Sequence, residues 1–412
     1  MKQRCKPGIK LLFLSNGHGE DVIALEIAKQ LQLSDLELAA LPLVGEGHAY
    51  TKLGVPAIAP VQTMPSGGFI YMDGFQLWKD VQQGLLGLSL AQLRAVRQWQ
   101  RTGGVILAVG DVVPLLFAWL SGANYAFIGT AKSEYHLRHE AGWHPQTSWL
   151  ERWSGVYYPW ERRLMRDRRC RAVFPRDSLT AKVLQQQGIG AFDLGNPMMD
   201  GIATEVVRFK NQRLTVLLLP GSRPPEAYQN WRQIVTAVEN IRTTLTEPAV
   251  FLAAIAPSLD LNHFAQLLPE VWHSQPLDSV DSPINPAQAL AFTHHNATLL
   301  LTSSAYADCL RSADVAISMA GTATEQFVGL GKAVITFPGA GPQFTPAFAE
   351  AYTRLLGPSF ILVERPDQVA AAMRSLFNDP QRQQLVAENG RQRMGSPGAA
   401  ARIVRCLQSR LF

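Results

Sequence analysis

The stretch that decides the fold is ADVAISMAGTATEQFVGLGKAVITFPGAG, residues 313–341. Residues 315–318 predict a short buried strand because they form an apolar run that ends in a serine. Gly321 then begins a predicted helix that runs to about Leu330, and residues 333–337 form the next apolar strand. Strand, glycine turn, helix and strand together make a βαβ unit, which is the building block of an α/β domain.

The turn of this unit suits a phosphate group. Its small residues leave backbone N–H groups accessible at a helix N-terminus, where the helix dipole is positive. They are Gly321, Thr322, Ala323 and Thr324. Glu325 follows inside the helix, where a carboxylate can accept hydrogen bonds from ribose hydroxyls. The alternative is that Thr322 or Thr324 only caps the helix and Glu325 only complements its dipole.

The composition describes a folded globular protein with room for two domains. The chain has 412 residues, 47% of them hydrophobic and 17% charged, which excludes a disordered chain. A net charge of +5 favours anionic partners such as nucleotides or acidic lipid, and is too small to argue for nucleic acid.

No apolar run reaches the ~20 residues of a membrane span. The cysteines show no metal-binding spacing and are expected to be free thiols in a reducing cytoplasm: Cys5, Cys170, Cys309 and Cys406.

The whole chain divides into two series of alternating strands and helices. In the first series we expect apolar strands at residues 9–15, 36–43, 105–110, 124–129 and 172–174. In the second series we expect them at residues 214–219, 250–256, 297–302, 314–318, 333–337 and 360–363. Gly195-Asn196-Pro197 interrupts the alternation and is the expected hinge. The sequence therefore predicts an N-terminal domain over 1–197 and a C-terminal domain over 198–397, and the last helix, 398–412, could pack back on the first domain.

The first series carries two candidate catalytic side chains. The turn after the first strand, residues 16–21, contains His18 but lacks the glycine spacing of a dinucleotide site. No acid ends the second strand either, so an NAD or FAD interpretation loses most of its support. Asp111 stands at the carboxyl end of the strand 105–110, where ligands of open α/β sheets bind. It could cap the following helix, act in catalysis, or do both.

A second glycine turn, Pro220-Gly221-Ser222-Arg223, follows the first strand of the second series. We expect it at the same sheet edge as the Gly321 turn. Arg223 could bind a phosphate through charge-assisted hydrogen bonds, or it could be an ordinary surface arginine near a helix start. Gly221 and Ser222 are counted with it as candidate nucleotide-binding residues.

Two stretches could touch a membrane. Residues 63–90 mix glycine with large apolar side chains, and residues 143–171 combine tryptophan and tyrosine with a run of arginines. Such mixtures suit the interface between water and acidic lipid. The alternatives are an ordinary buried loop and helix for the first stretch, and a solvated helix with its aromatic face buried for the second.

Three motifs together carry a resemblance to a known family. LLLPGSR at 217–223, SMAGTATE at 318–325 and FLSNGHGED at 13–21 resemble the lipid-A-disaccharide synthases, and most of all the branch called lipid-A-disaccharide synthase-related proteins. Gly195-Asn196-Pro197 with Asp200 is similar to that family's interdomain motif. The resemblance spans nearly the whole chain. It implies an α/β fold of GT-B type, with two doubly wound Rossmann-like domains that face each other across a cleft.

The resemblance also implies a hexosyltransferase of glycolipid biosynthesis. Such an enzyme would move a sugar, with inversion and without a metal or a cofactor, from a nucleotide-sugar donor to a lipid-linked acceptor. The donor is usually a UDP-sugar. The protein would be cytoplasmic and peripheral on the inner face of a membrane, with residues 63–90 and 143–171 against anionic lipid. Nucleic acid is not an expected partner.

Carried over by position, the family's site falls on particular residues of this chain. Arg223 and the Gly321–Thr324 turn would hold the diphosphate, and Glu325 would hold the ribose. Gln343 would touch the donor sugar. An inverting transfer needs one general base, and the candidates for it are, in order, Asp111 and His18.

This chain also departs from the family. His18 is inserted in the first loop, and residues 157–163 replace a tryptophan-containing stretch of the family. An additional segment, roughly residues 130–156, precedes them and should shape the acceptor pocket. Three other functions stay open. They are a glycolipid synthase of another family, a sugar-nucleotide 2-epimerase, and a non-catalytic protein that binds a nucleotide-sugar or a lipid.

Overall fold

The computed structural model describes residues 8–32, 36–44, 47–59, 85–202, 213–244, 247–339, 341 and 344–412. The chain forms two compact units, one of residues 1–200 with 395–412 and the other of residues 201–394. The chain leaves the first unit after Asp200 and returns to it with α16 (Ala399–Arg410). The sequence predicts these two crossings after residues 197 and 397.

The first unit is built on a five-stranded sheet in the order β2-β1-β3-β4-β7, in which every neighbouring pair is parallel. The strands are β1 (Lys10–Ser15), β2 (Glu37–Pro42), β3 (Val105–Gly110), β4 (Tyr125–Gly129) and β7 (Cys170–Pro175). They are nearly continuous apolar runs because a parallel sheet is covered on both faces. The strand order reverses between β1 and β3, and such a reversal is where doubly wound sheets bind ligands.

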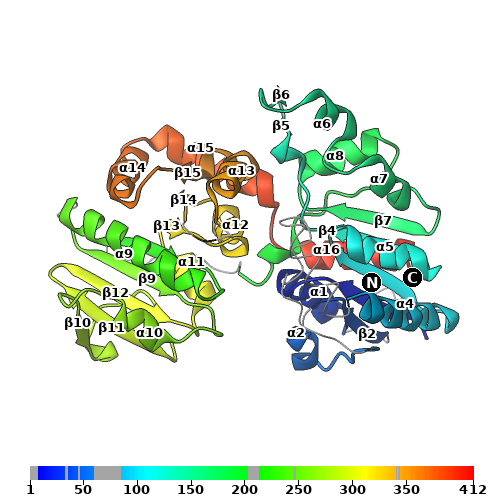
Figure 1. Ribbon diagram of the computed structural model, residues 1–412, viewed down its shortest axis with the longest axis horizontal. Coiled ribbons are helices and arrows are strands. Elements are labelled where there is room, and N and C mark those ends of the chain that lie inside the picture. Colours follow the sequence, from blue (N-terminus) through cyan, green and yellow to red (C-terminus); the bar gives the residue numbers. More distant parts are fainter. Residues whose placement is uncertain are drawn as a thin grey trace. The chain divides into compact units, whose positions relative to one another are not determined.

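Helices and short turns connect these strands (Figure 1). They are α1 (His18–Leu31), α2 (His48–Lys52), α4 (Leu85–Arg101), α5 (Val112–Ser121), η1 (Glu134–His136), the hairpin β5 (Arg138–His139) and β6 (Gly142–Trp143), α6 (Trp149–Ser154), α7 (Pro159–Met165), α8 (Ser178–Gln186) and η2 (Pro197–Met199). The red α16 lies beside the blue α1 (Figure 1). Asp200 fixes its start, because the carboxylate accepts hydrogen bonds of 2.6–3.0 Å from the first N–H groups of α16, those of Gly398, Ala399 and Ala400.

The second unit contains an eight-stranded sheet in the order β10-β11-β12-β9-β8-β13-β14-β15. Its strands are β8 (Leu214–Leu219), β9 (Ala249–Ala254), β10 (His273–Gln275), β11 (Ala289–His294), β12 (Ala297–Thr302), β13 (Val315–Ser318), β14 (Ala333–Thr336) and β15 (Phe360–Leu362). The six strands from β12 to β15 are parallel. Their chain order is 3-2-1-4-5-6, so the reversal lies between β8 and β13.

The helices of the second unit follow the same alternation. They are α9 (Glu226–Thr244), α10 (Leu261–Gln266), η3 (Leu277–Ser279), α11 (Tyr306–Ser312), α12 (Thr322–Gly329), α13 (Pro346–Leu356), η4 (Gly357–Ser359), η5 (Pro366–Gln368), α14 (Val369–Phe377) and α15 (Pro380–Met394). Trp231 of α9 is fully buried, and its ring N–H donates to the carbonyl of Phe264 in α10 at 3.0 Å. The indole therefore fills the core without leaving its polar group unsatisfied.

The sequence did not predict the two antiparallel strands at one side of this sheet, β10 and β11. β11 pairs antiparallel with β12 through a tight turn in which His295 has φ +52°. Half of the residues of β11 are only partly buried, so the strand lacks the continuous apolar run that marks the central strands. β11 is therefore a strand because it pairs with β12, and its own sequence does not mark it as one.

Candidate functional site

In the second unit the candidate nucleotide site lies at the carboxyl ends of β8 and β13, where the strand order reverses. The two glycine turns meet there. The N–H of Met319 donates to the carbonyl of Leu219 at 2.9 Å, and the carbonyl oxygen of Met319 lies 3.6 Å from where a Cβ on Gly221 would stand. Gly221 has φ +102°, which glycine adopts without strain. The fold thus places the Gly221 turn against the Gly321 turn.

Buried hydroxyl groups hold the Gly321 turn in its conformation. Thr324 is fully buried, and its hydroxyl donates to the carbonyl of Ala320 at 2.6 Å while lying 2.6 Å from the hydroxyl of Ser318. Thr324 therefore shapes the turn and does not present its side chain to a ligand. Thr322 and Ala323 are the first two residues of α12, and N–H groups at these positions have no acceptor within the helix. They are the donors that the turn offers to an anion.

Glu325 is held beside this turn by a residue that the sequence analysis does not single out. The carboxylate is 6% exposed, and the hydroxyl of Tyr352 donates to its Oε1 at 3.0 Å. The same hydroxyl lies 3.4 Å from the position of a Cβ on Gly321. The Tyr352 ring stacks on Phe348 one turn earlier in α13, with ring centroids 4.4 Å apart. In the sequence, only the four-residue spacing of Phe348 and Tyr352 along α13 could have pointed to Tyr352 as the partner of Glu325.

Arg223 and Ser222 lie where the chain enters α9. The carbonyl of Arg223 accepts a hydrogen bond from the N–H of Ala227 at 2.9 Å, and the Arg223 side chain is only partly exposed. Glu226, also absent from the predicted set, is buried and accepts from the N–H of Phe344 at 2.9 Å. It therefore ties α9 to the segment after β14. Gln343 of that segment lies outside the described residues.

In the first unit Asp111 stands at the reversal between β1 and β3. Its Oδ1 accepts a hydrogen bond from the N–H of Val113 at 2.8 Å, so it caps α5. The side chain is 7% exposed, and burial raises the pKa of this carboxyl to about 6. The cap hydrogen bond opposes that rise and the nearby charge of Glu20 adds to it. A carboxylate with this pKa is ionised at neutral pH and basic enough to accept a proton.

Glu20 of α1 reaches over the end of β3 toward Asp111. Its Oε1 accepts from the Thr130 hydroxyl at 3.2 Å, after β4. A Cβ on Gly110 would stand 3.2 Å from the Glu20 side chain and 2.1 Å from the Asn16 Oδ1, so only glycine fits at this position. The Asn16 Oδ1 is buried and, among the described residues, has no hydrogen-bond partner. Glu20 is not among the predicted site residues. His18 begins α1, and its side chain lies outside the described residues.

The structure also describes most of the cysteines and allows a search for metal-binding groups and membrane-spanning helices. Cys170, Cys309 and Cys406 are free thiols, and Cys5 lies outside the described residues. Within the ranges that the structure covers, no group of three or more His, Cys, Asp or Glu side chains is placed to hold a metal ion. No helix in those ranges combines the length and the apolar character needed to span a membrane.

The fold is similar to that of several solved structures over nearly the whole chain. The calicheamicin glycosyltransferase CalG4 has a TM-score of 0.59 at 16% identity, with 99% of each chain covered. S. aureus MnaA in its complex with UDP has a TM-score of 0.56 at 14% identity, covering 96% of this chain and 94% of that one. The UDP-GlcNAc 2-epimerase of Neisseria meningitidis bound to UDP-GlcNAc has a TM-score of 0.53 at 13% identity, covering 97% and 100%.

These comparisons confirm the predicted fold class, an α/β fold of GT-B type with two Rossmann-like domains. Identities of this size establish the fold alone. No family model matches the chain, and no curated protein matches it. None of the comparisons singles out the lipid-A-disaccharide synthases, so that resemblance stays a prediction from the three sequence motifs.

Proposed function

We propose that this protein is a metal-independent, inverting glycosyltransferase that uses a nucleotide-sugar donor. The observation that carries the proposal is the buried carboxylate of Glu325, which Tyr352 holds beside the Gly321 turn at the strand reversal of the second unit. A carboxylate next to the donors of a helix N-terminus matches two neighbouring groups of a nucleoside diphosphate, its ribose hydroxyls and its phosphates. The solved structures of similar fold support a nucleotide-sugar, because one is a complex with UDP and another with UDP-GlcNAc.

In the proposed donor site each group has one task. The N–H groups of Thr322 and Ala323, together with Arg223 and the Gly221–Ser222 backbone, meet the negative charge that grows on the leaving diphosphate. Glu325 accepts from the ribose hydroxyls. Gln343 is kept as a candidate contact to the donor sugar. The charge is thus stabilised by backbone dipoles and one guanidinium.

The general base is proposed to be Asp111, with His18 as the second candidate. The acceptor hydroxyl gives its proton to the base as its oxygen forms a bond to the anomeric carbon. On the opposite side of that carbon, the bond to the diphosphate oxygen breaks and the nucleoside diphosphate leaves. Asp111 suits this role because its pKa lies near 6, so that it is ionised at pH 7 yet remains a useful proton acceptor.

A nucleotide panel tests the donor proposal. A ligand that binds only the folded state raises the unfolding temperature with its concentration. We expect UDP and a UDP-sugar to raise the Tm of this protein, and GDP, ADP and NAD to raise it little or not at all. The donor proposal would have to be withdrawn if none of the nucleoside diphosphates changed the Tm, or if NAD alone did.

A sugar-nucleotide 2-epimerase is the second candidate, favoured by the similarity in fold to an enzyme of that name. The two reactions give different products without an acceptor. The epimerase converts UDP-GlcNAc into its 2-epimer and keeps the nucleotide attached, whereas the transferase releases UDP only as sugar reaches an acceptor or water. Product analysis of UDP-GlcNAc incubated with the protein therefore separates them. Binding of the nucleotide without either product, across a range of acceptors, would favour a non-catalytic binding protein.

A further inference from the structure

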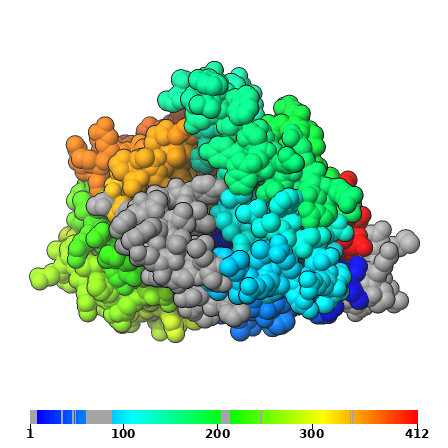
Figure 2. Space-filling view, turned by 45° about the vertical axis from the view of Figure 1, so that its right-hand side comes forward, coloured from blue at the N-terminus to red at the C-terminus, as the bar shows by residue number. Residues whose placement is uncertain are grey.

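The strongest feature outside the candidate sites is a set of exposed aromatic side chains on α6, on α7 and on the residue that precedes α7. They and one leucine form what we call the α6–α7 face, which consists of Trp149, Leu150, Trp153, Tyr158 and Trp160. Trp149 is 74% and Trp153 68% exposed, and Trp160 is 50% exposed. The sequence-based alternative, a helix with its aromatic face buried, holds for Tyr157 but not for these residues. Figure 2 shows the sea-green atoms of this segment at the molecular surface.

This exposure is concentrated rather than scattered. In the part of the chain that the structure describes, half of the large exposed apolar side chains fall within the 12 residues 149–160. Single exposed apolar residues are normal, but a group of this kind marks a surface that is covered by something else. Trp149 and Trp153 lie one helical turn apart in α6, so they project from the same side of it.

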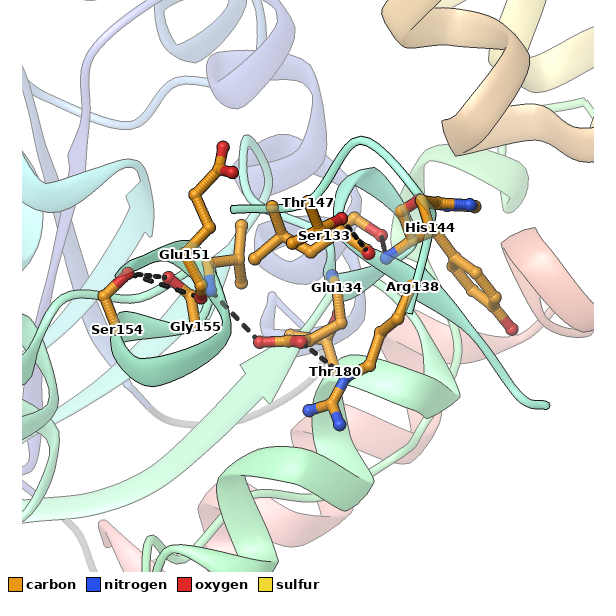
Figure 3. Close-up of polar contacts among 12 residues, drawn as sticks. Ser133, Glu134, Arg138, His144, Thr147, Glu151, Ser154, Gly155 and Thr180 are labelled. Atoms are coloured by element: carbon orange, nitrogen blue, oxygen red, sulfur yellow. Dashed lines mark hydrogen bonds and ion pairs between the residues drawn. The ribbon is translucent and has the colours of Figure 1, made fainter. Parts of the chain in front are cut away.

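Buried polar contacts hold the face in place. The carboxylate of Glu134 is buried, and it accepts from Nε of Arg138 at 2.8 Å and from the N–H of Val156 at 3.1 Å. The N–H of Glu134 donates to the Thr180 hydroxyl in α8 at 2.9 Å. Figure 3 shows these contacts joining the two ends of the segment that carries α6. Because Glu134 links both ends, the backbone that carries the tryptophans is held in place, and little backbone freedom would be lost on binding.

The second helix is fixed in the same way. Glu161 of α7 is fully buried, and both of its oxygens accept from Nζ of Lys132, at 2.8 and 2.7 Å. Its Oε2 also accepts from the N–H of Tyr158 at 2.7 Å. The Lys132 ammonium lies 4.7 Å from the centre of the Tyr158 ring. This buried ion pair sets the start of α7, from which Tyr158 and Trp160 extend outward.

The segment that carries the face is also basic. Residues 149–171 contain seven arginines and three acidic residues, which gives a net charge of +4 in a chain whose total is +5. Arg163, Arg168 and Arg171 are exposed. Tryptophan and tyrosine favour the head-group level of a bilayer, and clustered arginines favour anionic lipid. A segment that exposes both kinds of side chain is complementary to an anionic membrane.

We infer that the α6–α7 face docks this protein peripherally on an anionic lipid bilayer. Docking there would give the proposed transferase access to a lipid-linked acceptor. That acceptor rests on the proposed function. Membrane binding itself does not rest on it. The other apolar stretch, residues 63–90, lies mostly outside the described residues and adds nothing to the inference.

Co-sedimentation with vesicles tests the inference. We expect the full chain to bind vesicles of equal parts phosphatidylcholine and phosphatidylglycerol at low salt, and to bind pure phosphatidylcholine vesicles much more weakly. Trp149→Ala with Trp153→Ala should weaken binding at least about ten-fold. Arg163→Gln, Arg168→Gln and Arg171→Gln together should weaken it by about five-fold for each arginine and reduce its dependence on salt.

Matched controls come from the second unit. Leu385→Ala removes a leucine that is 51% exposed on α15, and Arg391→Gln removes an exposed arginine from the same helix. Both should bind vesicles as the wild type does. The inference is overturned if the wild type does not bind anionic vesicles at low salt, or if the double tryptophan variant binds as well as the wild type. It is also overturned if the wild type is a dimer that the double variant converts to a monomer. Vesicles without a sugar acceptor suffice, so failure of the transferase proposal leaves this test unaffected.

Discussion

Asp111→Asn is expected to lose about 10²- to 10⁴-fold in kcat while it binds the nucleotide donor as the wild type does. Asparagine keeps the size of the side chain and can still accept the hydrogen bond from the N–H of Val113 that caps α5. It cannot take a proton from the acceptor hydroxyl. Turnover measured with a nucleotide-sugar donor, together with a nucleotide-induced Tm shift, checks both parts of the expectation.

The same variant should be more stable than the wild type at high pH. Burial raises the pKa of Asp111 from 3.8 to about 6, so the ionised carboxylate weakens the fold. The stability contributed by the protonated form is present below pH 3.8 and is lost as the pH rises through about 6. Removing the charge should therefore add up to about 3 kcal/mol to the free energy of unfolding at pH 8, and nothing near pH 3. Denaturant unfolding at the two pH values measures this difference.

Asp260→Asn is the matched control, because Asp260 also caps a helix by accepting from the N–H two residues later, but it is exposed. It should change neither turnover nor the pH dependence of stability. Wild-type turnover in Asp111→Asn would remove Asp111 from the role of base. His18, and Glu20 beside Asp111, would then be the residues to change.

Glu325→Ala is expected to weaken nucleotide binding about 10- to 100-fold, because it removes a charged acceptor from the ribose hydroxyls. Tyr352→Phe should have a smaller effect, about 2- to 10-fold. It leaves the carboxylate in place and removes the 3.0 Å hydrogen bond by which the Tyr352 hydroxyl orients it. Titration calorimetry with the best nucleoside diphosphate of the panel measures both affinities.

Glu350→Gln provides the control for these two variants. Glu350 lies on α13 with Tyr352, but it is exposed and pairs with Arg354 at 2.8 Å. Its replacement should leave nucleotide affinity unchanged, since surface ion pairs of this kind contribute little. If Glu325→Ala bound the nucleotide as tightly as the wild type, Glu325 would only complement the dipole of α12, and the donor site would have to be sought elsewhere.

The central strands could be predicted from the sequence almost to the residue. β3 and β13 begin and end at the predicted residues, because a strand buried on both faces must be apolar throughout. β11, which lies between β10 and β12 and has only half of its residues buried, lacks that pattern, so it was missed. For the residues of α6 and α7 the sequence left two possibilities open, a surface that touches a membrane and a solvated helix with its aromatic face buried. Their exposed tryptophans depend on the buried contacts of Glu134 and Glu161 with residues distant in the sequence.

The sequence by itself determined the fold class, the two glycine turns, and the positions of Glu325 and Asp111 along the chain, since these depend on local composition and spacing. It predicted that the two turns lie at the same sheet edge, but not that they are in contact, because strand order is a property of the folded sheet. Only the tertiary structure placed the Gly221 turn against the Gly321 turn, and the end of β1 beside Asp111, at the two strand reversals. Only it showed Tyr352 holding Glu325, and Glu20 reaching over Gly110 to Thr130. The physical reason is that a hydrogen bond needs two groups within about 3 Å, and for residues far apart in the chain only the packing of the sheets brings them to that distance.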